Sequence, residues 1–385
     1  MKKMHLKHSL LVCSILLACA GQATATSYSL TIFAPPPDGV AVEATSINNA
    51  GVVSGNIFGS DYLSPSAVTW SGGSATYLDK AGGAFSGAEK INDQGTVIGS
   101  ITSIVHDNRG NVPVTTPAIW NNGVATTLPG LGQDRDFYPT RATGLNNAGV
   151  VVGVSGFGPG GRGGHAVKWV NGVATDLGAA GGSESYANAI NDNGQIVGSA
   201  KTQSGYDKAV LWENGTAIDL AVQAGVSSSL AMDINNAGVV VGRQTSGEVS
   251  SYNHATIWHN GVATQLDFAY GDSDALAINN VGDVVGYAPG DYDFPHGVLW
   301  KNGEMIDLNN YLDASLRADG WILVSATDIN DRGDIVGELY KSGTNIEVGY
   351  LLAVSAVPEP STYAMMLSGF GLLAFAARRR RGPQS

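Results

Sequence analysis

Three short acidic stretches with aromatic neighbours are the parts of this sequence best suited to bind a ligand. They are Asp-Arg-Asp-Phe-Tyr, Asp-Ser-Asp and Asp-Tyr-Asp. Carboxylates beside aromatic rings suit sugars or a hard cation such as calcium, although no stretch has the full spacing of a calcium loop. Solvated acidic loops are the alternative interpretation. The candidate ligand-binding residues are Asp134, Asp136, Tyr138, Asp272, Asp274, Asp291 and Asp293.

Two other patterns could do chemistry but fit a structural role better. His165, His254 and His296 hold equivalent positions in separate repeats, so we expect them to lie too far apart to share a metal ion. Segment 156–161 has the Gly-x-Gly-x-x-Gly spacing of nucleotide-binding loops, but no helix follows it to bind phosphate. The chain contains no nucleophile motif, phosphate-binding Lys-Thr loop or metalloprotease helix. We therefore expect a protein that is not an enzyme and has no cofactor, with bound calcium as the alternative.

The elements that must position these residues come from one unit that occurs seven times. The repeated phrase is Ile-Asn-(Asn/Asp)-x-Gly-x-(Val/Ile)-x-Gly, with Leu for Ile once. Most copies begin about 44 residues apart, a period in the range of propeller blades. The copies begin at Ile47, Ile91, Leu145, Ile190, Ile234, Ile278 and Ile329.

Each unit predicts four short strands. The first ends in Ala-x-x-Ile-Asn, and the alanine in every copy indicates a crowded position on an innermost strand. The Asn-x-x-Gly turn follows. After it comes a Val-rich second strand that is expected to be buried on both faces. Six units continue with a strand that ends in Trp, for which packing between blades is the favoured role. An Asn-Gly hairpin turn and a short strand to Leu complete most of these units, with Gly-Gly in the first. The seven alanines are Ala44, Ala88, Ala142, Ala187, Ala231, Ala275 and Ala326, and the six tryptophans are Trp70, Trp120, Trp169, Trp212, Trp258 and Trp300.

The strand count predicts how the ring closes. The seventh unit lacks its fourth strand, and an additional strand, 28–33, precedes the first unit. Pairing the two removes exposed sheet edges. We therefore predict an all-β, seven-bladed β-propeller with four-stranded blades, closed by the N-terminal strand in the last blade. An open solenoid is the alternative.

Both ends of the chain have the composition of sorting segments around a propeller at 26–356. Residues 1–25 combine lysines, an apolar run and a small-x-small cleavage site, which predicts a secretory signal peptide. In a second interpretation, Leu-Leu-Ala-Cys is a lipobox and Cys19 is lipidated. The tail 357–385 contains Pro-Glu-Pro, an apolar run over 363–377 and an arginine cluster, and a plain membrane anchor is its alternative interpretation. The tail residues of interest are Pro358, Glu359, Pro360, Arg378, Arg379, Arg380 and Arg381.

This tail resembles the PEP-CTERM sorting signal of Gram-negative bacteria. The resemblance implies an exosortase as partner, transient membrane anchoring, cleavage near Pro-Glu-Pro, and a final location at the cell surface or outside the cell. The repeat over 28–354 resembles extracellular HAF repeats, although Phe is missing from His165-Ala166 and His254-Ala255. That resemblance implies no established activity.

The net charge and the variation among the loops indicate the class of function that we expect. The net charge of −12 disfavours binding to nucleic acid. The turns after the first and third strands are uniform, whereas the other loops differ in length and content, which is typical of binding loops on a rigid frame. We call the face with the differing loops the variable face. We expect a non-enzymatic surface or matrix protein, including a biofilm matrix, that binds polysaccharide or another protein. The alternatives are a glycan-active enzyme with paired loop carboxylates, or a calcium-stabilised adhesive module.

Overall fold

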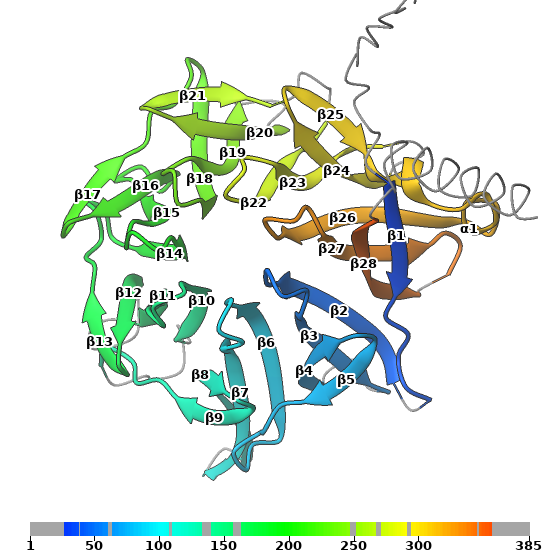
Figure 1. The fold of residues 1–385 in the computed structure, drawn as a ribbon. Coiled ribbons are helices and arrows are strands. Elements are labelled where there is room, and N and C mark those ends of the chain that lie inside the picture. The colour runs from blue at the N-terminus through cyan, green and yellow to red at the C-terminus, as the bar shows by residue number, and fades with distance from the viewer. Residues whose placement is uncertain are drawn as a thin grey trace, which may run out of the picture. The chain divides into compact units, whose positions relative to one another are not determined.

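The computed structural model describes residues 27–355, except 38, 61–63, 108–109, 133–139, 157–162, 247–251, 267–270, 291–293 and 345. Within these residues, the strands form seven four-stranded sheets arranged as blades around a ring (Figure 1). The predicted seven-bladed β-propeller is confirmed.

The blades follow one another along the chain. Blade 1 contains β2 (Gly39–Ile47), β3 (Val53–Gly59), β4 (Pro65–Ser71) and β5 (Ser74–Tyr77). Blade 2 contains β6 (Phe85–Ile91), β7 (Val97–Asp107), β8 (Gly110–Asn121) and β9 (Val124–Thr127). Blade 3 contains β10 (Arg141–Leu145), β11 (Val151–Gly156), β12 (Gly164–Val170) and β13 (Val173–Asp176). Blade 4 contains β14 (Ser185–Ile190), β15 (Ile196–Lys201), β16 (Asp207–Glu213) and β17 (Thr216–Asp219).

The later blades follow the same order until the last. Blade 5 contains β18 (Val226–Ile234), β19 (Val240–Ser246), β20 (Tyr252–His259) and β21 (Val262–Gln265). Blade 6 contains β22 (Asp274–Ile278), β23 (Val284–Pro289), β24 (Pro295–Lys301) and β25 (Glu304–Asp307). Blade 7 contains β26 (Trp321–Ile329), β27 (Ile335–Lys341), β28 (Glu347–Ser355) and, as its outermost strand, the N-terminal β1 (Ser27–Ile32).

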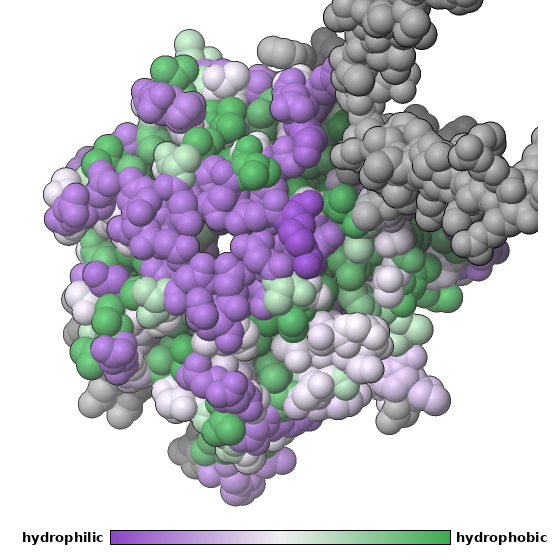
Figure 2. Space-filling model, viewed as in Figure 1, coloured by the Kyte–Doolittle hydropathy of each residue, from purple (hydrophilic) through white to green (hydrophobic). Residues whose placement is uncertain are grey.

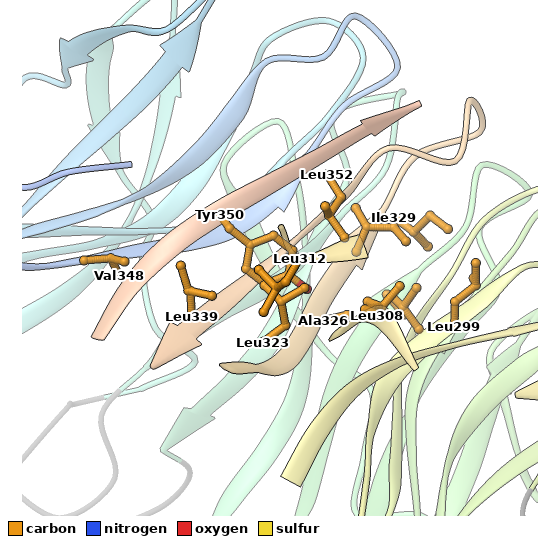
Figure 3. Close-up of a cluster of buried hydrophobic side chains, with 13 residues drawn as sticks. Leu299, Leu308, Leu312, Leu323, Ala326, Ile329, Leu339, Val348, Tyr350 and Leu352 are labelled. Carbon is orange, nitrogen blue, oxygen red and sulfur yellow. The ribbon is translucent and has the colours of Figure 1, made fainter. Parts of the chain in front are cut away.

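Blade 7 closes the ring with strands from both ends of the repeat region. Just beyond β1, the backbone N–H of Phe33 donates to the carbonyl of Gly349 at 2.9 Å. Tyr28 and Leu30 pack on the blade's core, which contains Tyr350 and Leu352 (Figure 3). The connection between blades 6 and 7, expected only as a variable loop, forms a 3₁₀ helix, η1 (Leu308–Tyr311), and a short helix, α1 (Ala314–Ala318).

Each innermost strand contains the same irregularity beside its alanine. All seven alanines are buried, and each pairs with a glycine of the second strand, as Ala231 pairs with Gly242. A Cβ on Gly242 would clash with the carbonyl oxygen of Leu230. A β-bulge follows each alanine and leaves the next residue unpaired. The unpaired residues are Thr45, Glu89, Thr143, Asn188, Met232, Leu276 and Thr327.

The tryptophans pack between blades, as the sequence predicted. Trp120 of blade 2 is buried against Leu78 of blade 1, and its indole N–H donates to the carbonyl of Asp79 at 2.7 Å. Trp169 and Trp258 make the equivalent bond to their preceding blades. An aromatic side chain with its N–H bonded across the interface fixes both the spacing and the orientation of adjacent blades.

Candidate functional site

A polar channel runs along the axis of the ring. In the view of Figure 2, hydrophilic residues surround the central opening. The Asn-x-x-Gly turns line this half of the channel, which contains a cavity of about 170 Å³. A second cavity of about 280 Å³, which we call the chamber, is lined by the bulge residues. Lys90 and Asn188 line both cavities.

The first asparagine of every turn belongs to a closed ring of hydrogen bonds. Its Nδ2 donates to the backbone carbonyl of the equivalent asparagine in the next blade, at 2.9–3.1 Å around the full circle. Its Oδ1 accepts backbone N–H groups of its own turn, as Asn146 Oδ1 accepts those of Ala148 and Val150. One side chain thus shapes its turn and joins two blades. The ring consists of Asn48, Asn92, Asn146, Asn191, Asn235, Asn279 and Asn330.

The following residue of each turn forms a second closed ring. Each backbone N–H donates to Oδ1 of the equivalent residue in the next blade, at 2.8–2.9 Å. Asp93 Oδ2 also accepts Nδ2 from both flanking residues, Asn49 and Asn147. The carboxylates are therefore satisfied within the ring. Its members are Asn49, Asp93, Asn147, Asp192, Asn236, Asn280 and Asp331.

Deeper in the channel lie one amine and two carboxylates. Lys90 Nζ is 3.5 Å from Asp328 Oδ1. Asp328 Oδ2 accepts from Ser46 Oγ at 2.5 Å and from the N–H of Ile47 at 3.1 Å, which joins blade 7 to blade 1. Burial alone would lower the pKa of Lys90, but the nearby carboxylates, Asp328 foremost, raise it above its usual value. Lys90 therefore stays charged and compensates these carboxylates.

Asp233 is the second carboxylate of this layer. It accepts the N–H of Ile278 from the next blade at 2.9 Å. Burial raises the pKa of Asp233 to about 6, although the charge of Lys90 and this N–H act in the opposite direction. The group therefore titrates well above an ordinary aspartate.

Acidic residues line one side of the chamber, and apolar residues line another side. Glu43 of blade 1, Glu89 of blade 2 and Glu338 of blade 7 line it from three adjacent blades. Met232 of blade 5 and Leu276 of blade 6 line it from across the ring. Burial is the main cause that raises the pKa of all three glutamates. The chamber thus combines an acidic wall with an apolar wall.

Three of the polar, uncharged bulge residues join adjacent blades. Thr327 Oγ1 donates to the carbonyl of Ala44, Thr143 Oγ1 to that of Ala187, and Asn188 Nδ2 to that of Ala231, each in the next blade. Glu89, Met232 and Leu276 hold the same bulge position but make no such bond in the part of the chain that the structure describes. Thr45 Oγ1 donates to the carbonyl of Ser54 in its own blade, so Glu89, Met232 and Leu276 are the bulge residues whose side chains make no hydrogen bond with the described residues.

The predicted acidic candidates are only partly within the described residues. Asp134, Asp136, Tyr138, Asp291 and Asp293 lie outside them. Asp272 Oδ1 accepts the N–H of Asn253 at 2.8 Å, and Asp274 is buried. Asp274 Oδ2 accepts from Arg243 Nη1 and Tyr287 Oη, both at 2.7 Å. The structure thus engages both described aspartates in protein contacts, and ligand binding by these loops stays a prediction.

The histidines lie on third strands, two of them beside a carboxylate of the fourth strand. His165 Nδ1 is 3.0 Å from Asp176 Oδ2, and His296 Nδ1 is 2.8 Å from Asp307 Oδ2. In blade 4, Lys208 takes the histidine's place and pairs with Asp219 at 2.7 Å. These cross-strand pairs within single blades support the predicted structural role. Among the described residues, no group of three or more His, Cys, Asp or Glu is placed to hold a metal ion.

The repeat pattern alone did not identify the channel residues. The signal was present in the two positions between the repeated alanine and isoleucine, where Glu89-Lys90, Asp233 and Asp328 introduce charges into otherwise similar strands. Glu43 and Glu338 lie outside the repeated phrase, on different strands of neighbouring blades. Only the ring closure shows that they face one cavity.

A comparison with protein families confirms the predicted tail. Residues 356–381 match the PEP-CTERM protein-sorting motif. Their positions lie outside the described residues, as does the predicted apolar segment 363–377. In the part that the structure describes, no helix is long and apolar enough to cross a membrane. The chain is a seven-bladed β-propeller with a motif for export and processing by an exosortase.

Comparisons with individual proteins add little to this assignment. No curated protein sequence matches the chain. Among solved structures, a puromycin hydrolase mutant complexed with PGG is 12% identical, with a TM-score of 0.46, and the match covers 81% of this chain and 50% of the hydrolase. This chain thus matches half the length of that enzyme.

Two further structures give similar values. AofleA from Arthrobotrys oligospora is 12% identical, with a TM-score of 0.37, over 74% of this chain and 90% of AofleA. Trypanosoma rangeli sialidase in complex with sialic acid is 11% identical, with a TM-score of 0.40, over 90% of this chain and 60% of the sialidase. At these values the similarities support no statement about the function of this chain.

Proposed function

We propose that this chain is an exported, surface-associated binding module without enzymatic activity, which holds a polysaccharide or another surface protein. The observation that carries the proposal is the division of the propeller into a constant and a variable part. Two closed hydrogen-bond rings fix the turns on one face. Variation is concentrated in the chamber lining and in the loops of the variable face, where a rigid frame can present binding residues.

The test is binding of the purified full chain to an array of bacterial and plant polysaccharides, with and without calcium. We expect selective binding that is lost when Asp134 and Asp136, or Asp291 and Asp293, become alanine. Glu304→Ala is the matched control, because Glu304 is exposed beside a uniform Asn-Gly turn. If the chain binds no polysaccharide selectively in either condition, the proposal that it holds a polysaccharide is refuted. Binding only with calcium would instead support the calcium-stabilised adhesive module.

One observation favours a second candidate function, a glycan-active enzyme. Glu43, Glu89 and Glu338 face one cavity, and burial raises the pKa of each. Glycoside cleavage needs a pair of carboxyl groups, one of which stays protonated to act as the acid. Release of reducing ends from a bound polysaccharide, abolished in both Glu89→Gln and Glu338→Gln, would establish this activity. We favour binding because no aromatic ring is among the described residues of the chamber to stack on a sugar.

A further inference from the structure

We propose that the axial chamber binds a primary alkylammonium group, with its charge against Glu89 and its aliphatic chain against Met232 and Leu276. The proposal rests on the binding role proposed above and names the class of ligand that this part of the propeller takes.

Among the described residues that line the chamber, three are carboxylates and only one, Lys90, is a cation. Glu43 Oε2 accepts from Asn56 Nδ2, and Glu338 Oε2 accepts from Ser325 Oγ, both at 3.1 Å. Glu89 forms no hydrogen bond or ion pair with the described residues. Lys90 and Arg141 lie near enough to lower the pKa of Glu89, but less than burial raises it. Lys90 makes its ion pair with Asp328, which lines the first cavity and not the chamber. A carboxylate in such a place gains most from a cation that brings its own hydrogen-bond donors.

The position of Glu89 in the ring indicates which groups the ligand should carry at its two ends. Glu89 belongs to blade 2, so the blades directly across the ring are 5 and 6, which contribute Met232 and Leu276. Each is the bulge residue of its strand, equivalent to the threonines that join blades elsewhere. A ligand that spans the chamber therefore meets a carboxylate at one end and a thioether and an isobutyl group at the other. Alkylammonium ions have this polarity, whereas metal ions and diamines do not.

Size and access also fit a small ligand. The chamber of about 280 Å³ is just below the range of about 300–1,000 Å³ for drug-sized pockets, so it suits a chain of a few carbons. Solvent reaches the Glu89 side chain although protein surrounds it, as expected in an open channel. The flexible side chain of Met232 can adjust to different chain lengths.

The test is isothermal titration of the full chain with n-hexylammonium, ethylammonium, hexan-1-ol and hexane-1,6-diammonium at pH 7.5. We expect hexylammonium to bind most tightly. Each methylene buried is worth about a fourfold gain in affinity, so ethylammonium should bind at least tenfold more weakly. Hexanol lacks the charge, and the diammonium ion would place its second charge against Met232 and Leu276. Equal binding of hexanol or of the diammonium ion, or no binding of hexylammonium, would overturn the proposal.

Variants locate the binding in the chamber. We expect Glu89→Gln to weaken hexylammonium binding at least tenfold, and Leu276→Asn to weaken hexylammonium more than ethylammonium. Glu304→Gln, the exposed control, should bind like the natural chain. Unchanged binding in Glu89→Gln would refute the assignment, and the ligand series on the natural chain remains decisive if a variant fails to fold.

Two further experiments identify the source of the amine and distinguish this proposal from the proposed role as a surface binding module. Displacement of hexylammonium by an Nα-acetylated lysine amide would identify a lysine side chain of a partner protein as the ligand, and its failure would identify a free amine. Polysaccharide binding by the surface loops without hexylammonium binding would refute the chamber assignment and leave the binding module standing. Hexylammonium binding that persists when the array gives no signal would support the chamber and refute only the polysaccharide arm.

Discussion

Asn330 in the last blade donates from Nδ2 to the backbone carbonyl oxygen of Asn48 in the first blade, at 3.0 Å. The same bond joins every other pair of adjacent blades, so the axis closes as completely between the first and last repeats as between sequence neighbours. The ring is therefore closed in two places. The asparagine side chains close it at the axis, and β1 completes blade 7 at the outer edge.

Asn330→Ala should destabilise the propeller by about 2–4 kcal/mol. The change removes the bond to Asn48 and leaves the N–H groups of Arg332 and Asp334 without their acceptor. Denaturant unfolding of the full chain measures the effect. Asn302→Gly is the matched control, since Asn302 sits in an exposed hairpin turn at φ 54°, which glycine adopts readily, and should cost less than about 0.5 kcal/mol. Equal effects of the two changes would contradict a special role for the ring.

Two glycines of blade 4 should respond differently to alanine. A Cβ on Gly198 would meet the carbonyl of Tyr186, whereas a Cβ on Gly194 has no neighbour within 4 Å. Gly198→Ala should therefore prevent folding or cost more than about 3 kcal/mol, since backbone must move. Gly194→Ala should cost only about 1–2 kcal/mol, for the positive φ of 80°. Circular dichroism and thermal unfolding of both variants decide the matter, and similar melting temperatures would show that the alanine–glycine pairing is not the constraint we infer.

Asp233 should make stability fall as the pH rises from about 4 to about 6. Its folded pKa of about 6 lies above the unfolded value near 3.8, so the folded chain binds the proton more tightly. The unfolding free energy is then highest below pH 4 and loses at most about 3 kcal/mol by pH 6. The glutamates of the chamber contribute in the same direction. Urea unfolding at pH 4, 5, 6 and 7 should show a shallower decline for Asp233→Asn than for the natural chain. A decline as steep in Asp233→Asn as in the natural chain would refute the assignment.

The repeated unit predicted the fold because its residues have the same structural roles in most blades. Ala231 is buried on an innermost strand, Asn235 shapes a turn and joins two blades, and Trp258 packs between two blades. These roles are local or recur at a fixed period, so they can be inferred from one chain.

The chamber could not be predicted in the same way. The bulge after each alanine breaks the alternation of a regular strand, and it brings Glu89 to the axis. Glu43 and Glu338 are far apart in sequence, and only ring closure places them on one cavity. The acidic loops were visible in the sequence, but of them only Asp272 and Asp274 fall within the described residues, where protein groups hold both.

Removing β1 should destabilise the propeller without opening the axis. A chain that begins at Phe33 loses Tyr28, Leu30 and Ile32, which pack on the core of blade 7, and leaves β28 as an exposed edge. Tyr28 also packs edge-on against Tyr311, with ring centroids 4.7 Å apart. Since each such side chain contributes about 1–2 kcal/mol, we expect a loss of about 3–5 kcal/mol, and concentration-dependent association through the free edge of β28. Sedimentation velocity and denaturant unfolding measure the two effects. Adding a synthetic peptide of residues 27–32 should restore the monomer, because the vacant edge accepts the same strand from outside. A shortened chain that stays monomeric at natural stability would show that the two asparagine rings alone close the propeller.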